Sequence, residues 1–177
     1  MKRLWVLLLA LFFLSCSENA PSSPKGTSAV PSVSFSEEEG RLGIVVEGVC
    51  RYTVIRPETA SERVRVAAGS IDTFLFHHLD THIFVKNDFA PPSPWEILVG
   101  ETNREESQRI LAELSEGEFA VECVGRKLVI VGRGDKAVEK AVEWFLESFV
   151  KNRSLSEGEI PALVIAPEGG YRGKLGS

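Results

Sequence analysis

The sequence lacks most of the patterns that mark an enzyme or a nucleic-acid-binding protein. Its 177 residues contain no G-x-S-x-G motif, and neither Cys50 nor Cys123 has an evident basic partner that would activate a thiol nucleophile. The formal net charge is −5, and there is no basic stripe. This argues against nucleic acid as a partner, because affinity for phosphates needs clustered Lys and Arg. The length suits one domain with a proper core.

The chain also lacks an apolar run long enough to span a membrane. The run Leu4–Leu14 has eleven residues, follows Lys2 and Arg3, and has the length of the apolar region of a secretory signal. It ends in FLSC (Phe13–Cys16), which resembles the lipobox of bacterial lipoproteins, where the cysteine is lipidated and becomes the mature N-terminus. The resemblance implies lipidation of Cys16. The alternative is plain secretion, in which Cys16 is incidental.

Four segments follow from this organisation. Residues 1–16 are expected to be a lipoprotein signal peptide. Residues 17–40 are rich in Ser, Pro, Ala and Gly, and we interpret them as a flexible tether because they cannot bury enough apolar surface to offset chain entropy. Residues 41–167 are expected to form a single domain, followed by a tail at residues 168–177. The lipid would then hold the domain at a membrane, on the extracytoplasmic face of the bacterial cell envelope.

Short apolar runs alternate with helical stretches after residue 40, which predicts an α/β fold: a mixed β-sheet with about three helices packed on it, as a two-layer α/β sandwich. Helices are expected over Ala60–Leu79, from a capping box at Thr102 and Glu105 to about Leu114, and over Asp135–Val150. The first helix carries an apolar stripe formed by Val64, Ala67, Ala68, Ile71, Leu75 and Leu79. Strands are expected at residues 41–48, 51–57, 82–86, 95–99, 118–124, 127–131 and 162–166, with a hairpin or a tight corner after the first. The run at 95–99 is nearly all apolar, as expected of a central strand buried on both faces. In the second helix, Ile110, Leu111 and Leu114 are expected to face inward.

The stretch Gly132–Asp135 (GRGD) joins an apolar run to a helix, in the outline of a dinucleotide-binding turn. The position argues against that interpretation, because the preceding strand is the second arm of a hairpin late in the chain and Asp135 would repel a pyrophosphate. We therefore interpret Asp135 as the N-cap or a first-turn carboxylate of the helix, and the sequence indicates no cofactor. The Arg133–Asp135 tripeptide, known as an integrin ligand, is interpreted as a coincidence.

Two of the three histidines, His78 and His82, lie four residues apart, a spacing that suits zinc when both occupy one helix face. The helix is expected to end near Leu79, which would break that geometry, so we interpret them as a polar helix end and expect no metal. Cys50 and Cys123 leave two alternatives open: they pair outside the cytoplasm, or they are separate buried side chains.

One family resemblance covers most of the expected domain. Three segments resemble a module found in secreted bacterial proteins: YTVIRPETASERVRVAAGSIDTFL, EILVGETNREESQRIL and FAVECVGRKLVIVGRGDKAVEKAVEWFLESFV. This module occurs as the N-terminal domain of α-glucuronidases and as the second domain of β-hexosaminidases. The resemblance spans Arg41–Lys151. It implies a mixed sheet with helices and a non-catalytic role, because in that family the chemistry lies in a domain that follows the module.

These observations predict a non-catalytic accessory or binding module linked to carbohydrate processing, with a glycan or a protein as its partner. The alternatives are the N-terminal part of a truncated or split glycan-active hydrolase, and a small hydrolase whose acid–base pair is not evident. The loop Asn87–Trp95 offers Phe89 and Trp95 as candidate ligand-binding residues, because sugar rings stack on aromatic faces. For Trp95 the alternative is that it begins a buried strand and fills the core.

Cys16→Ala should release the protein from membranes, because the lipid on this cysteine is the expected anchor. Membrane fractionation of cells that produce the wild type or the variant measures this. The neighbouring substitution Ser17→Ala should leave the protein in the membrane fraction. If the Cys16→Ala protein stays membrane-bound and is processed normally, the lipobox interpretation is wrong.

Overall fold

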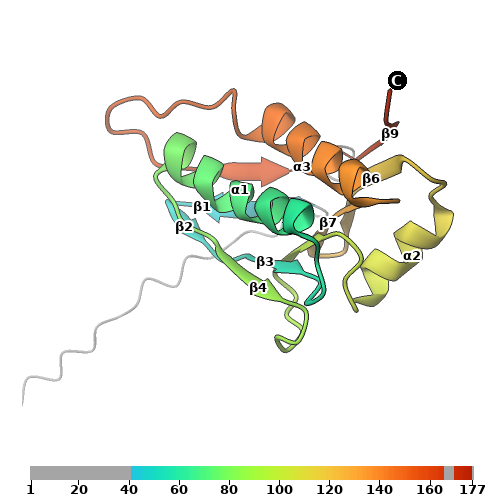
Figure 1. The fold of residues 1–177 in the computed structure, drawn as a ribbon. Coiled ribbons are helices and arrows are strands. Elements are labelled where there is room, and N and C mark those ends of the chain that lie inside the picture. Colours follow the sequence, from blue (N-terminus) through green and yellow to red (C-terminus); the bar gives the residue numbers. More distant parts are fainter. Residues whose placement is uncertain (1–40, 166–169, 177) are drawn as a thin grey trace, which may run out of the picture. The chain divides into compact units, whose positions relative to one another are not determined.

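The computed structural model describes residues 41–165 and 170–176, so the expected signal peptide and tether, with Cys16, lie outside the described residues. This part of the chain contains three helices (Figure 1): α1 (Glu62–Leu79), α2 (Glu105–Glu113) and α3 (Asp135–Phe149). Its strands are β1 (Leu42–Val46), β2 (Val49–Cys50), β3 (Thr53–Arg56), β4 (Phe84–Asn87), β5 (Glu96–Val99), β6 (Glu118–Val124), β7 (Lys127–Gly132), β8 (Leu163–Ile165) and β9 (Tyr171–Lys174).

Six strands form a mixed sheet in the order β4-β3-β5-β7-β6-β9. The neighbours from β4 to β7 are parallel, whereas β6 runs antiparallel to both β7 and β9. Along the chain, α1 connects β3 to β4, and α2 connects β5 to β6. The strands β2, β1 and β8 form a smaller antiparallel sheet. The predicted α/β class, with a mixed sheet and three helices, is confirmed.

Helices cover both faces of the six-stranded sheet, because its central strands alternate between two cores. Along β5, Ile97 and Val99 belong to the core that includes residues of α1 and α3, whereas Leu98 belongs to the core that includes residues of α2. All four residues of β5 are buried, as expected of a central strand. Figure 1 shows α1 and α3 side by side, with α2 away from them. The layer that α2 forms is an addition to the expected sandwich.

Helix α1 buries the stripe that its sequence predicts, since all six of the stripe's residues are buried. The helix begins at Glu62, two residues later than expected, because Ser61 is its N-cap and accepts a hydrogen bond of 3.3 Å from the backbone N–H of Val64. It ends at Leu79, as predicted. The next residue, Asp80, has left-handed backbone angles and donates its N–H to the carbonyl of Phe76.

The first hairpin is shorter than the sequence suggests. β1 pairs with β2 across Glu47 and Gly48, both of which have positive φ angles, and the chain then turns into β3 of the other sheet. The expected strand at residues 51–57 is therefore the four-residue β3, which begins a new sheet rather than closing a hairpin. β8, which follows α3, pairs along the other side of β1.

The sheet continues past residue 167, where the sequence analysis ended the domain. β9 pairs antiparallel with β6 from Glu118 opposite Lys174 to Val121 opposite Tyr171. Tyr171 also stacks on Trp144 of α3, with ring centroids 4.4 Å apart. The sequence of β9 is Tyr-Arg-Gly-Lys, which offers no apolar run for a pattern to detect. Pairing with β6 therefore makes a strand of residues that were expected to form a tail.

The turn Gly132–Asp135 has a structural explanation. A Cβ atom on Gly132 would lie 2.5 Å from the carbonyl carbon of Ala137, so α3 packs on the end of β7 at a distance that only glycine permits. Gly134 is the N-cap of α3 with a φ angle of 92° and makes no side-chain capping bond. Asp135 lies in the first turn of α3, which is one of the two roles expected for it.

Gly132→Ala should destabilise the protein by about 3 kcal/mol, because the new methyl group meets backbone atoms of α3 that cannot move aside cheaply. Gly69→Ala is the matched control: Gly69 lies inside α1 with open space around its Cα, so alanine should stabilise the helix by about 0.5–1 kcal/mol. Urea unfolding of both variants measures the difference. Equal stabilities would contradict the close packing of α3 on β7.

Candidate functional site

An open hollow of about 540 Å³ lies between the loop that follows β4 and the start of α2. Because β4 and β5 both run parallel to β3, the loop must return from the carboxyl end of β4 to the amino end of β5. Ala90 of this loop packs against the core that includes residues of α2. The hollow is lined by Asp88, Phe89, Ala90, Pro91, Pro92, Asn103, Arg104, Glu105, Glu106 and Lys127.

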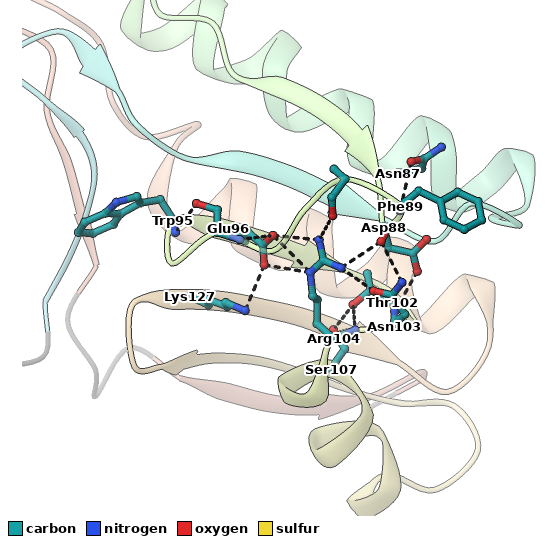
Figure 2. Close-up of polar contacts among 12 residues, drawn as sticks. Asn87, Asp88, Phe89, Trp95, Glu96, Thr102, Asn103, Arg104, Ser107 and Lys127 are labelled. Atoms are coloured by element: carbon teal, nitrogen blue, oxygen red, sulfur yellow. Dashed lines mark hydrogen bonds and ion pairs between the residues drawn. The ribbon is translucent and has the colours of Figure 1, made fainter.

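Arg104 holds the loop in place (Figure 2). Its side chain is 6% exposed and forms an ion pair with Glu96, which is 1% exposed, with 3.1 Å between Nη2 and Oε1. The same guanidinium donates to the backbone carbonyls of Asp88 (3.0 Å) and Ala90 (2.6 Å) and to Oδ1 of Asn103 (2.6 Å). One planar group thus ties β5, the loop and the start of α2 together, and its donors are satisfied by the protein.

Glu96 has a second cation beside it. Lys127, at the start of β7, places its Nζ 3.1 Å from Glu96 Oε2 and 3.0 Å from Glu106 Oε1. Burial acts to raise the pKa of Glu106, but hydrogen bonds from its own backbone and from Lys127 outweigh it, so the pKa is lowered. This carboxylate therefore stabilises the fold above the pKa of the unfolded chain, and the contribution is lost as the pH falls through the folded-state pKa.

The expected capping box at Thr102 is wrong, because α2 begins at Glu105 with Arg104 as its N-cap and without a side-chain capping bond. Thr102 is instead fully buried and donates its hydroxyl to Ser107 Oγ at 2.8 Å. Asp88 reaches across from the loop and accepts the backbone N–H of Asn103 at 2.9 Å. The segment before α2 is thus fixed by a buried contact with the first turn of the helix and by contacts with the loop, rather than by a capping box.

Phe89 and Trp95 lie at opposite ends of this cluster, as Figure 2 shows. Phe89 is 71% exposed on the rim of the hollow. Trp95 is half-buried against the core that includes α1 and α3, meets Tyr52 edge to face at 5.8 Å between ring centroids, and has the guanidinium of Arg126 5.2 Å above its ring. The structure therefore does not bring the two candidate residues into one site, and only Phe89 lines the hollow.

Two other hollows differ from this one in chemistry. A crevice of about 250 Å³ at the carboxyl ends of β3, β5 and β7 contains Glu101 and Asp135, and no aromatic residue lines it. A groove of about 540 Å³ between α1 and α3 includes the ring of Phe74, but Lys151 Nζ covers that ring at 4.9 Å. A further hollow of about 420 Å³ at the end of α1 has polar groups around Phe76, but this ring is 43% exposed and is already stacked on His82, with 4.5 Å between ring centroids. Among these hollows, the one beside Phe89 has the more exposed aromatic ring beside polar groups.

The histidines and cysteines lie elsewhere. His78, in the last turn of α1, contacts the carbonyl of Arg153, whereas His82, beyond the helix, pairs with Asp72 at 3.0 Å. Within residues 41–165 and 170–176, no group of three or more His, Cys, Asp or Glu side chains could hold a metal ion. In the same residues, no helix is long and apolar enough to cross a bilayer.

Cys50 and Cys123 form no disulfide in the structure. Burial raises the pKa of the Cys50 thiol and also that of the nearby Tyr52 hydroxyl. A thiol with a raised pKa is protonated at neutral pH and is a poor nucleophile, so Cys50 does not fit a catalytic role.

The sequence analysis missed the residues that build this site. One signal was available: Glu96 interrupts an apolar run expected to be a central strand, and a buried carboxylate needs a cationic partner. The partners, Arg104 and Lys127, come from elements 8 and 31 positions away along the chain. Nothing local in the sequence identifies them among its other basic residues.

Comparison with known proteins adds a likeness of fold. No protein-family model matches the sequence, and no curated protein matches it. Among solved structures, a family GH115 4-O-methyl-alpha-glucuronidase with specificity for decorated arabinogalactans is similar with 12% sequence identity and a TM-score of 0.46. The alignment covers 76% of this chain and 18% of that enzyme. The likeness is therefore to the arrangement of helices and strands in one part of a much longer protein.

Arg104→Ala should destabilise the protein by about 3–5 kcal/mol, because Glu96 and two loop carbonyls would lose buried partners. The matched control is Arg65→Ala, which removes an exposed pair with Glu62 and should change the free energy of unfolding by less than about 0.5 kcal/mol. Chemical denaturation measures both. An Arg104→Ala protein as stable as the control would contradict the role of the buried pair.

Proposed function

We propose that this chain is a non-catalytic binding module that takes a neutral glycan in the hollow beside Phe89, held at the extracytoplasmic face of a bacterial membrane by lipid on Cys16. The observation that carries the proposal is a phenylalanine ring, 71% exposed, on the rim of a hollow whose walls are fixed by a buried ion pair. A site that is already formed costs little conformational entropy to fill.

The lining supplies both kinds of contact that a sugar ring requires. The face of Phe89 offers an apolar surface on which the C–H groups of a pyranose can stack. Around it, Asp88 and Glu105 offer carboxylate acceptors, Asn103 offers an amide, and Lys127 has donor capacity beyond its two carboxylate partners. A few polar groups around one apolar face fit a ligand that carries many hydroxyls and an apolar ring face.

The charges of the hollow favour a neutral glycan over an acidic one. Three carboxylates line it (Asp88, Glu105 and Glu106) against the two cations Arg104 and Lys127. Both cations are already paired with carboxylates, since the buried Glu96 forms an ion pair with each of them and Lys127 also pairs with Glu106. A uronate or sulfate group would therefore enter a site with an excess of negative charge and without a cation to spare.

The same pairing supports binding rather than turnover. Hydrolysis of a glycoside needs two carboxyl groups, one of which stays protonated to act as the acid. Glu96 is buried against Arg104 and Lys127 and is not among the residues that line the hollow, so it is out of reach of a bound sugar. The pKa of Glu106 is lowered rather than raised, which does not suit the acid's role.

Phe89→Ala should weaken binding of neutral glycans by at least about tenfold, because the stacking surface is lost while the fold is untouched. A glycan array that contains neutral, uronate and sulfated glycans measures this with the purified protein. The control is Phe76→Ala, which removes a phenylalanine that is 43% exposed at the end of α1, away from the hollow. It should leave binding unchanged.

The other outcomes each reject part of the proposal. Binding to no glycan would reject the glycan and leave a protein partner as the remaining hypothesis. Preferential binding to uronates or sulfates would contradict the argument from charge. Release of product from an aryl-glycoside would reject the non-catalytic role and favour the alternative of a glycan-active hydrolase.

A further inference from the structure

Strand β4 forms one edge of the six-stranded sheet (Figure 1), and β3 is the strand that pairs with it in the part of the chain that the structure describes. An edge strand presents N–H and C=O groups along its outer side, which can pair with another strand. β4 also bears Phe84, which is 77% exposed. This is the highest exposed fraction of any large apolar side chain among the described residues. This edge therefore presents a large exposed apolar side chain beside the backbone groups of its outer side.

The side chains of β4 divide between the two faces of the sheet. Val85 is half-buried against the core that includes α1 and α3. Its neighbours Phe84 and Lys86 are both exposed, and strand alternation places them together on the opposite face. The edge thus carries an exposed ring and an exposed ammonium group two residues apart on one face.

We propose that β4 pairs antiparallel with β4 of a second copy of this chain, with Val85 opposite Val85 at a two-fold axis. In this register each residue lies opposite a residue from the same face of the partner's sheet, so the two sheets join with matching faces. It places Phe84 of each copy opposite Lys86 of the partner subunit, with Cβ atoms about 5 Å apart. The ammonium group then lies within reach of the ring, where a cation–π contact is favourable.

The neighbouring registers lack this complementarity. A shift by two residues in one direction sets Lys86 opposite Lys86, which is unfavourable because like charges face each other across the strands. A shift by two in the other direction sets Phe84 opposite Phe84 and leaves Lys86 facing His82. A lysine on an edge strand normally discourages pairing; here it fits one register and disfavours others. Self-complementarity about an axis is what a symmetric dimer requires.

The contact is short, so the dimer belongs to the weak class of protein interfaces. β4 has four residues, and an interface built on them lies at the lower end of the size range of specific complexes. It should therefore be populated at high protein concentration. Phe89 lies beyond the end of β4, in the turn that follows it, so dimerisation and glycan binding can be tested separately.

Sedimentation velocity of the full chain in mild detergent, over about 10 µM to 1 mM, should show a reversible monomer–dimer equilibrium. Phe84→Ser and Lys86→Glu should each weaken the dimer at least about tenfold, because each removes one partner of the cation–π pairs. The control Phe89→Ala should dimerise as the wild type does. A wild type that is monomeric throughout, or both edge variants dimerising like the wild type, would overturn the proposal.

Cysteine cross-linking tests the register itself. With a mild thiol oxidant, Val85→Cys should form covalent dimers at least about tenfold above the wild type, because the two new thiols meet at the axis. Phe84→Cys or Lys86→Cys alone should stay at the wild-type level, whereas a mixture of these two variants should cross-link. Self-cross-linking of either single variant above that of Val85→Cys would overturn the proposed register.

Discussion

The buried ion pair between Arg104 and Glu96 is the interaction on which the rest of the proposed site depends. Two charges in the protein interior are costly unless each finds its partner and its hydrogen bonds. Here both conditions are met by groups from four segments: β5, the loop after β4, the start of α2 and β7. Because the guanidinium also binds the carbonyls of Asp88 and Ala90, the loop after β4 has its backbone fixed without regular secondary structure. The exposed ring of Phe89 is thus presented from a rigid base.

The sheet explains why this loop exists. Its central strands are apolar on both sides and need helices on both faces, which α1 and α3 provide on one side and α2 on the other. β4 and β5 are parallel to β3 and lie on either side of it, so the chain must cross a face of the sheet without a helix between them. That crossing leaves polar and aromatic groups at the margin of the area that α2 covers. Binding surfaces of this kind lie on loops that a rigid scaffold positions.

Local patterns accounted for the helices. The buried stripe of α1 and its end at Leu79 follow from spacing along a single segment, because a helix buries one face with a period of 3.6 residues. The inward residues Ile110 and Leu111 of α2, and Leu114 at its C-cap, follow in the same way. The capping box at Thr102 failed because the hydroxyl found a buried partner in Ser107. The expected capping box was replaced there by a different local contact, between the segment before α2 and the first turn of the helix.

The sequence by itself determined the α/β class, the helix faces and the central, doubly buried strand, because each of these depends on neighbours a few residues apart. Only the tertiary structure decided which charges meet, that Phe89 and Trp95 lie apart, and that Tyr171–Lys174 joins the sheet. Those outcomes depend on contacts between distant segments, for which the chain carries no periodic pattern. The turn at Gly132 depends on both. The sequence shows its two glycines, but only the packing of α3 on β7 shows that a side chain at Gly132 would collide with the helix backbone.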